Sequence, residues 1–351
     1  MENSEHEAAW PEVIETVDAL EECLSRPTAA VIDDLAALDG DLVVLGAGGK
    51  MGPSLARMAR RALDAGGAPH DVIAVSRFSG EGPRARLEQA GVRTLSADLL
   101  DPGTVDALPS AAGVFFLVGT KFGTSLDVAR TWAVNDELAR AVAARYSGVP
   151  TVVFSSGNVY PFVPVEGPGA DERTQPAPVG EYARSVLARE RAFAQRAACA
   201  GTPVLQYRLN YAVELRYGVL VDVARRVLAG EPVDLAMGWL NAIWQGDACA
   251  AALRCLPLCA CPPKALNVTG SERLSVRWLA EEFGARFARP PLFSGEERET
   301  ALLSDATMAL ERFGPGRVSI ERAIDWTAAW LRAGGEIWDK PTGFERRDGA
   351  F

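Results

Sequence analysis

The chain has 351 residues, which indicates two domains at about 150 residues per domain. It carries 36 basic and 46 acidic residues, and the net charge of −10 argues against a nucleic-acid or anionic-membrane surface and for a soluble protein. Only two histidines occur, His6 in a polar N-terminal segment and His70 in a predicted loop. A histidine-dependent triad, general base or metal site is therefore not expected.

The N-terminal segment MENSEHEAAW is acidic, and no apolar run approaches the ~18 residues of a membrane span. We therefore expect a cytoplasmic protein that does not contact a membrane. Six cysteines are too few for a disulfide scaffold. Four of them cluster, but their spacing matches no zinc pattern, so small buried apolar cysteines are favoured over a metal site. These four are Cys249, Cys255, Cys259 and Cys261.

Helical patterns and short apolar runs alternate along the first two thirds of the chain. Two helical patterns, 10–25 with Pro11 at its start and 28–39, predict an N-terminal helical cap over residues 1–40. Strands that alternate with helices then predict an α/β fold, a Rossmann-like doubly wound parallel sheet. The predicted strands are 42–45, 72–75, 92–95, 114–118, 151–154 and 204–209. The predicted helices between them are 54–65, 84–90, 125–145 and 181–198.

After residue 210 this alternation ends, and helices separated by Pro- and Gly-rich segments predict a smaller substrate-binding lobe. These helices are expected near 218–229, 247–256, 275–287 and 319–333. We assign residues 41–210 to the Rossmann domain, with 240–268 returning to it. Residues 211–239 and 269–351 form the predicted lobe.

A glycine-rich loop follows the first predicted strand and opens the next helix. Gly46, Gly49 and Gly52 form the pattern G-x-x-G-x-x-G, in which the glycines permit a tight turn, close approach of a pyrophosphate and close packing of helix on strand. The loop predicts a dinucleotide site, and the alternative is a merely tight turn. Lys50 and Met51 of the loop are counted among the cofactor-binding residues.

The second strand ends in Ser76 and Arg77, where an NAD site usually carries an acidic residue. An arginine pairs well with a 2′-phosphate, so NADP is favoured over NAD; a solvated arginine is the alternative. Asp98, followed by Leu99, stands where it could reach an adenine, or could cap a helix. Val118 and Gly119 follow the fourth strand at the sheet edge where ligands bind.

Further motifs lie along the chain: Asn135, S-S-G-N-V-Y at 155–160, Tyr182, R-L-N-Y at 208–211, G-D-A at 246–248 and L-N-V-T at 266–269. With the glycine loop they resemble the extended short-chain dehydrogenase/reductase family, the group of nucleotide-sugar epimerases and dehydratases. The resemblance covers about residues 41–331.

The resemblance implies that Tyr182 is the general acid/base and that Ser156 hydrogen-bonds the substrate hydroxyl or carbonyl. The hydride would pass to or from a nicotinamide, so the chemistry needs no histidine. Asn210 would contact the substrate. Asn158 and Trp244 are included as substrate-binding residues.

The chain departs from the family at Val186, where members carry a lysine four residues after the tyrosine. A tyrosine without a nearby cation keeps a pKa near ~10 and is a poor base at neutral pH. Arg184 points to another side of the helix, and Arg189 lies two turns away. We therefore predict that Lys121, after the fourth strand, supplies the missing cation; a solvated loop lysine is the alternative.

The stretch 238–245 also departs from the family, because it lacks the arginine that grips a diphosphate. A nucleotide handle on the substrate is therefore not favoured. Arg208 and Arg216 are candidate anion contacts or structural ion-pair partners. Family members dimerise through the helices predicted at 125–145 and 181–198, so a homodimer is expected.

The function predicted on these grounds is an NADP- or NAD-dependent epimerase, reductase or dehydratase of a small sugar-like molecule, working through a keto intermediate. One alternative is a redox-inactive dinucleotide-binding sensor or regulatory protein, which Val186 favours. The other is a non-redox proton-transfer enzyme on the same fold.

Overall fold

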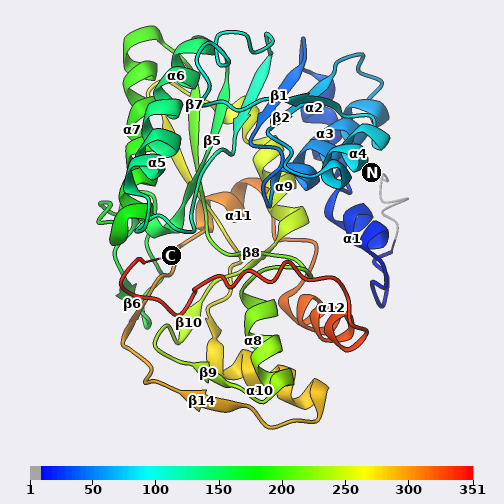
Figure 1. The fold of residues 1–351 in the computed structure, drawn as a ribbon, viewed down its shortest axis with the longest axis vertical. Coiled ribbons are helices and arrows are strands. Elements are labelled where there is room, and N and C mark those ends of the chain that lie inside the picture. The colour runs from blue at the N-terminus through cyan, green and yellow to red at the C-terminus, as the bar shows by residue number, and fades with distance from the viewer. Residues whose placement is uncertain (1–8, 351) are drawn as a thin grey trace.

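The computed structural model describes residues 9–350, so His6 lies outside the described residues. Its main element is a sheet of seven parallel strands in the order β12-β7-β5-β4-β1-β2-β3 (Figure 1). The central strands are apolar and buried along their length, because helices cover both faces of the sheet. The bounds are β1 Leu42–Leu45, β2 Val72–Ser76, β3 Arg93–Ser96, β4 Gly113–Phe116, β5 Thr151–Ser156, β7 Val204–Leu209 and β12 Lys264–Val268.

The predicted Rossmann-like α/β fold is confirmed, and each of the six predicted strands lies within two residues of its expected bounds. The seventh strand, β12, was not among the predicted strands. It pairs with β7 only after the chain has left the sheet, passed through part of the lobe and returned. Residues 240–268 were expected to return to this domain, but their apolar pattern alone did not assign a strand there.

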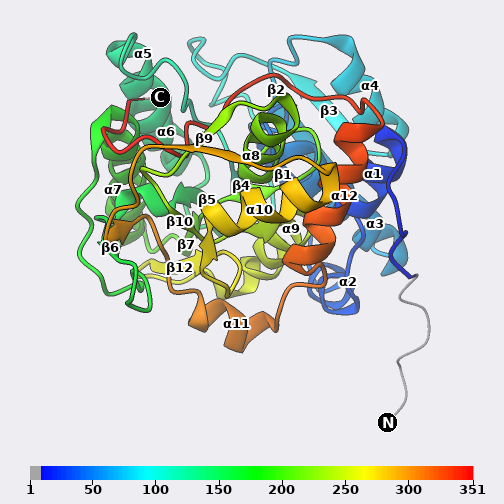
Figure 2. The ribbon, with the colours of Figure 1, turned by 90° about the horizontal axis from the view of Figure 1, so that it is seen from below.

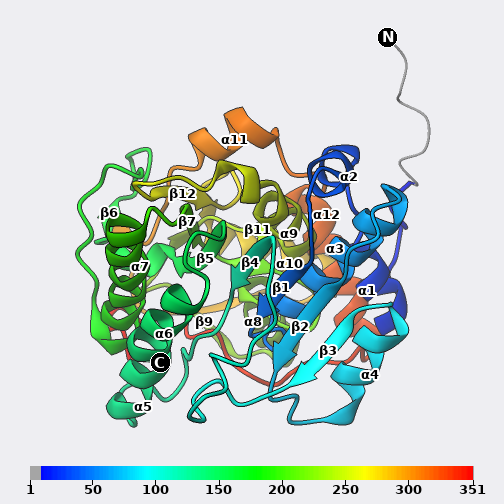
Figure 3. The same cartoon turned by 90° about the horizontal axis from the view of Figure 1, so that it is seen from above.

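Two helical layers sandwich the sheet, as Figure 3 shows from above. On one face α2, α3 and α9 bury apolar side chains against alternate strand residues, and on the other face α6 and α7 do the same. Strands with both faces covered in this way form the core of the larger domain. The helices are α2 Ala29–Ala36, α3 Gly52–Ala65, α9 Gln245–Arg254, α6 Leu138–Arg145 and α7 Gly180–Ala200, with α4 Glu81–Gln89 beside β3.

The helix predicted at 125–145 is interrupted. It consists of α5 (Val128–Trp132), a π-helical turn (Ala133–Glu137) and α6. The extra residue in the turn places the Asn135 side chain in the interior, where its Nδ2 donates to Ser185 Oγ of α7 over 2.8 Å. Such turns inside a helix often accompany functional sites.

The lobe has its own apolar core, in which α8, α10 and α12 pack around Trp326 and Trp330 (Figure 2). Small two-stranded sheets close its edges. The helices are α8 Val219–Ala229, α10 Val276–Phe287, α11 Thr307–Phe313 and α12 Ile320–Arg332. The strand pairs are β8 Ala212–Val213 with β11 Ile243–Trp244, β9 Pro232–Asp234 with β14 Leu292–Ser294, β10 Trp239–Leu240 with β13 Leu274–Ser275, and β6 Val163–Pro164 with β15 Thr300–Ala301.

The first helix, α1 (Val17–Leu24), begins after Thr16, whose hydroxyl accepts from the Ala19 N–H over 3.1 Å. The expected start at Pro11 was therefore wrong. The second helix, α2, begins after Thr28 in the same way and ends at Ala36. The two N-terminal helices have different partners, because α1 packs into the lobe core and α2 into the sheet core.

After α12 the chain runs back across the front of the molecule as a strap, which we define as residues 336–350 (Figure 1, red). The strap passes between the sheet and the lobe and is bound to both. Thr342 Oγ1 donates to Asp222 Oδ2 of α8 over 2.6 Å. At the far end, Gly349 packs so closely against Gly180 that a side chain on either residue would clash with the other's backbone.

Candidate functional site

A cavity of about 320 Å³ lies at the carboxyl edge of the sheet, where the segments after β1, β2, β3 and β4 meet. We call it the loop cavity. Its volume and its place at this edge are typical of ligand sites in doubly wound sheets. Eight of the eleven residues predicted to bind a dinucleotide line it: Gly46, Gly49, Ser76, Arg77, Asp98, Leu99, Val118 and Gly119.

The glycine loop needs its glycines for two reasons. Gly46 has φ +87°, and a Cβ there would lie 2.8 Å from the Val118 nitrogen of the neighbouring strand segment. A Cβ on Gly52 would lie 2.5 Å from Ala47 Cα, so Gly52 allows α3 to pack on the loop and does not line the cavity. Met51 caps α3 without a side-chain hydrogen bond. This helix end can therefore offer backbone N–H groups to a phosphate, and the loop fits a dinucleotide.

The end of β2 faces the same cavity. The Arg77 guanidinium lies 3.8 Å from the Asp98 carboxylate, which pairs two residues that were predicted for different parts of the cofactor. Ser76 packs against the loop, since a Cβ on Gly48 would lie 2.5 Å from Ser76 Oγ. The preference for NADP over NAD stays a prediction.

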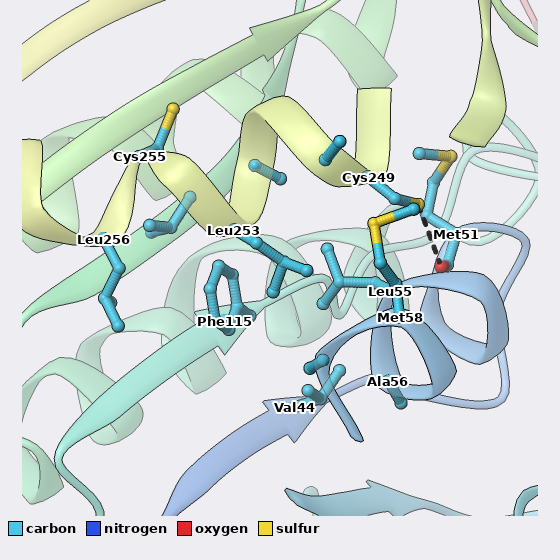
Figure 4. Close-up of a cluster of buried hydrophobic side chains, with 14 of the residues drawn as sticks. Val44, Met51, Leu55, Ala56, Met58, Phe115, Cys249, Leu253, Cys255 and Leu256 are labelled. Atoms are coloured by element: carbon cyan, nitrogen blue, oxygen red, sulfur yellow. Dashed lines mark hydrogen bonds between the residues drawn. The ribbon is translucent and has the colours of Figure 1, made fainter. Parts of the chain in front are cut away.

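Of the four clustered cysteines, Cys249 and Cys255 lie in the core, Cys259 is partly buried and Cys261 is exposed, so the expectation of a buried apolar cysteine was wrong for Cys261. Figure 4 shows Cys249 of α9 beside Met51, to whose carbonyl its thiol donates over 3.9 Å. Burial raises the pKa of the Cys249 thiol above its ordinary value. Cys255 packs in the same cluster, so for these two residues the apolar interpretation is confirmed. Residues 9–350 contain no group of three His, Cys, Asp or Glu side chains placed to hold a metal ion.

A second cavity, of about 160 Å³, contains the predicted catalytic pair, and we call it the tyrosine cavity. Ser156 ends β5, Tyr182 lies in the first turn of α7, and their hydroxyls are hydrogen-bonded. Ser156 Oγ also donates to Asn158 Oδ1 over 3.1 Å and accepts from the Asn158 N–H over 3.2 Å. These contacts orient the serine. The other lining residues are Lys50, Met51, Lys121, Ser155, Leu209, Asn210, Tyr211, Ala212, Tyr217, Gly218, Val219 and Thr342.

The structure thus brings four predicted substrate or catalytic residues to the cavity of Tyr182: Lys121, Ser156, Asn158 and Asn210. Asn210 is buried, and its Nδ2 donates to the Leu302 carbonyl of the lobe over 3.3 Å. Asn210 therefore connects the tyrosine cavity with the lobe.

Val186, which stands where the family has a lysine, packs into an apolar cluster with Val159, Tyr160 and Leu187. Its side chain is 1% exposed. The cluster has the composition of a small core, and a lysine ammonium at this position would lose its hydration without gaining a charged partner there.

Arg189 is the cation whose charge acts on Tyr182. Its Nη1 donates to the Phe154 carbonyl over 2.7 Å, and its Nη2 donates to Asn135 Oδ1. Burial raises the pKa of Tyr182, while the Arg189 charge and the Ser156 hydrogen bond lower it; the net pKa lies above the ordinary value. Burial also lowers the pKa of Arg189 to about 10.

Sequence reasoning set Arg189 aside because it lies two turns from Tyr182. A spacing of seven residues returns to the same face of a helix, and a long side chain in a helix points toward its N-terminus. These two facts together could have identified Arg189.

Lys121, the predicted replacement cation, lines the tyrosine cavity and donates to the Thr342 carbonyl of the strap over 2.8 Å. Burial lowers its pKa to about 8, against the opposing charges of Asp222 and Glu345. Lys121 and Tyr182 share one cavity, and the catalytic role of Lys121 stays a prediction.

The Lys50 side chain leaves the glycine loop and crosses toward the lobe. Its Nζ donates to the Ala212 carbonyl and lies 4.6 Å from the centre of the Tyr217 ring. Burial lowers the pKa of Lys50 to about 8. The backbone of Lys50 therefore belongs to the predicted cofactor loop, and its ammonium lies in the tyrosine cavity.

The two arginines considered as anion contacts are held in buried ion pairs. Arg208 binds the Glu190 carboxylate through two nitrogens (2.9 and 2.7 Å) and donates to the Tyr160 hydroxyl over 2.8 Å. Arg216 binds Glu21 of α1 over 2.7 Å and Glu214 over 3.1 Å. Both arginines therefore have structural partners.

Two further predictions concern the lobe and the partner subunit. Trp244 is buried in the lobe core, its ring centre 5.3 Å from that of Trp326, and it lines neither the loop cavity nor the tyrosine cavity. The structure therefore does not bring it to the catalytic pair. On the predicted dimer helices, Val142 and Phe193 pack in the sheet core, whereas Leu126 is 94% exposed. The homodimer stays a prediction.

No helix within residues 9–350 is long and apolar enough to cross a bilayer. No protein-family model matches the chain, and no curated protein matches it. Solved structures match at low identity.

Three of the solved structures illustrate the likeness. MoeE5 in complex with UDP-glucose and NAD is 21% identical, with 84% of this chain and 99% of that chain covered and a TM-score of 0.68. UDP-glucose 4-epimerase from Thermotoga maritima, with UDP-glucose, is 17% identical (84% and 99% covered, TM-score 0.67). UDP-glucuronic acid 4-epimerase from Bacillus cereus, with NAD, is 16% identical (83% and 98%, TM-score 0.70). The chain has the fold of these three proteins, over nearly their whole length.

Proposed function

We propose that this protein is an NAD(P)-dependent oxidoreductase of the epimerase, reductase or dehydratase type, acting on a small sugar-like hydroxy or keto compound. The observation that carries the proposal is the hydrogen-bonded pair of Ser156 and Tyr182 in a cavity that Lys50 and Met51 of the glycine loop also line. Structural neighbours solved with NAD support the class of cofactor.

In this proposal, the loop residues hold the pyrophosphate, Arg77 faces the adenosine ribose and Asp98 faces the adenine. When bound, the nicotinamide supplies the acceptor and donor of the hydride. Ser156 holds the substrate oxygen against Tyr182. Tyr182 takes the hydroxyl proton as the carbon–hydrogen electron pair leaves the carbinol carbon, and returns a proton to the carbonyl oxygen in the reverse step.

Tyr182 needs help as a base, because burial raises its pKa. Arg189 provides it in this proposal: its buried positive charge favours the phenolate and takes the place of the lysine that Val186 replaces. Arg189 acts through Tyr182 and does not line the cavity, so it is a positioning residue.

The first test is release and rebinding of the cofactor. The purified protein is denatured, and the supernatant is examined by absorbance and mass. Retained NAD(H) or NADP(H) favours an enzyme that recycles its hydride, and reversible binding of NADPH favours a reductase. A panel of sugars and hydroxy acids is then tested for reduction of NAD⁺ or NADP⁺.

The sensor alternative has one observation in its favour, the burial of Val186 in an apolar cluster. It predicts tight binding of the dinucleotide with no turnover of any member of the panel. Failure to bind NAD(H) or NADP(H) at all would contradict both the enzyme and the sensor.

A further inference from the structure

The tyrosine cavity has a charge pattern that the proton transfer does not use. Lys50 and Lys121 both line it, and among the described residues that line it none is acidic. The same two lysines also line a wider cleft of about 870 Å³ over the glycine loop. Its other charged lining residues are Arg57, Arg86, Arg216 and Lys340, with Glu21 and Glu336 as the acidic ones. Positive charge is thus concentrated beside the catalytic pair of a chain whose net charge is −10.

The carboxylates whose charge acts on these lysines are those of Glu214, Asp222 and Glu345. None of them lines the cavity, and each has another partner, which for Glu345 is Arg226. Glu214 accepts from the Arg216 backbone over 3.0 Å and from its Nε over 3.1 Å. Asp222 accepts from both the backbone and the hydroxyl of Thr342. Lys50 and Lys121 repel each other, which further lowers the pKa of Lys50. An anion in the cavity would relieve this repulsion.

The lysine side chains lie on the substrate side of the site. Neither Lys50 nor Lys121 lines the loop cavity, where the adenosine half of the dinucleotide would lie. The ammonium of Lys50 is turned toward Ala212 and Tyr217, which belong to the lobe side.

The tyrosine cavity is small, and Thr342 of the strap lines it. A cavity formed by Phe344 and Gly349 of the strap with Tyr160 and Tyr211 has a volume of only about 20 Å³, the room of about one water molecule. The tyrosine cavity, at about 160 Å³, is below the ~300 Å³ at which sites for larger ligands begin.

We propose that Lys50 and Lys121 bind the anionic group, a carboxylate or a phosphate, of a small hydroxy or keto substrate whose reacting carbon lies against Ser156 and Tyr182. The inference rests on the proposed function and specifies its substrate class: a compact acid or phosphate ester that carries its own anion and no nucleotide. Two charge-assisted hydrogen bonds would fix the substrate's orientation.

The test is calorimetric titration of the full chain, with and without saturating NADH. The probes are glycerate for a carboxylate, glycerol 1-phosphate for a phosphate, glycerol as their neutral counterpart, and UDP-glucose. We expect one of the two anions to bind at least about tenfold more tightly than glycerol and than UDP-glucose. Which anion binds identifies the source of the charge.

Lys50→Met and Lys121→Met should each remove about tenfold or more of this preference in the titrations without NADH. Lys340→Met is the matched control, because Lys340 lines only the wide cleft and should keep the preference. Thermal unfolding verifies that each variant is folded. If Lys50→Met does not fold, Lys121→Met carries the test alone.

The inference is overturned if neither anion binds better than glycerol, if UDP-glucose binds more tightly than both, or if the lysine variants keep the preference. The inference is also overturned if saturation with NADH abolishes the preference for the anion, since the lysines would then bind the cofactor phosphates. Failure to bind NADH would contradict the proposed function. The two results can be told apart, because the anion titration without NADH still reports on the lysines.

Discussion

Arg189 lies two helical turns beyond Tyr182 on α7, and its guanidinium is the charge that lowers the pKa of the buried phenol. Its hydrogen bonds to the Phe154 carbonyl and to Asn135 Oδ1 fix its position beneath the end of β4, where a Cβ on Gly119 would lie 2.6 Å from Arg189 Nη2. The cation that a Tyr-based proton transfer needs is therefore present, although the residue four positions after Tyr182 is a valine.

Arg189→Met should move the rising limb of the pH profile of turnover to higher pH by about one unit or more, because the Tyr182 phenol loses the positive charge of Arg189 and its pKa rises further. Arg189→Lys, which keeps the charge, should restore the profile in part. The pH dependence of kcat is the measurement. Loss of stability with an unchanged profile would assign Arg189 a purely structural role.

Val186→Lys should lower the free energy of unfolding by about 3 kcal/mol or more, because it places an ammonium in the apolar cluster of Val159, Tyr160 and Leu187. It should not raise turnover. Val186→Met, which keeps the site apolar, is the control. Chemical denaturation measures the loss, and a stable and more active lysine variant would contradict the assignment of Arg189.

Tyr182→Phe and Ser156→Ala should each lower kcat by about 10²–10⁴-fold, because the first removes the proton acceptor and the second the group that holds the substrate oxygen. The Kd for NADH should stay nearly unchanged, since neither residue lines the loop cavity. Steady-state kinetics and a fluorescence titration of NADH check the two statements. Undiminished turnover by Tyr182→Phe would exclude the proposed proton transfer.

Lys50 and Lys121 should make stability depend on pH in the alkaline range. Their folded pKa of about 8 lies below the ordinary value of 10.5, so between these pH values the unfolded chain binds more protons and the stability of the folded state rises with pH. Between pH 7 and pH 10, the free energy of unfolding of the wild type should rise by on the order of 1 kcal/mol per lysine relative to that of a Lys50→Met/Lys121→Met variant, allowing for solvent screening. Denaturant unfolding at pH 7 and pH 10 measures the difference.

Arg208→Met should lower the free energy of unfolding by about 3–5 kcal/mol, because it leaves the Glu190 carboxylate buried and without its bidentate partner. The double variant Glu190→Met/Arg208→Met should recover much of this loss. Equal stability of the single and the double variant would show that Ser155 and the remaining groups satisfy Glu190 alone.

Periodicity was enough to predict six of the seven strands of the sheet, because four-residue apolar runs such as Leu42–Leu45 and the helical segments between them are local patterns. The glycine loop and the Ser156–Tyr182 pair were also predictable, since each occupies a fixed place at the end of a strand or in the first turn of a helix. The interruption at Ala133–Glu137 was not, because one extra residue in a helix leaves the apolar pattern almost unchanged.

Contacts between distant segments were the other part that the sequence did not reveal. The sequence places Lys50 in the glycine loop, and only the structure shows that its ammonium donates to the Ala212 carbonyl. A tryptophan such as Trp244 can stack on a substrate ring or pack in a core. The structure decides between the two, because the Trp244 ring packs against Trp326 in the lobe core. The sequence of the strap shows no apolar periodicity, because isolated residues attach it to the rest of the protein: Phe344 is buried, and Thr342 hydrogen-bonds to Asp222.

The buried contact between Glu21 and Arg216 also bears on how this chain diverges from its relatives. Glu21 binds Arg216 over 2.7 Å, the Arg216 guanidinium lies 5.0 Å from the Trp338 ring, and Trp338 stacks on Tyr217 at 5.9 Å. Helix α1, the lobe and the strap thus meet in one continuous stack beside the tyrosine cavity. Loss of any one of the four residues would leave a buried charge without its partner or leave a cavity. These four positions should therefore change together over evolutionary time. A homologue without the N-terminal helices should also have lost the arginine and the tryptophan.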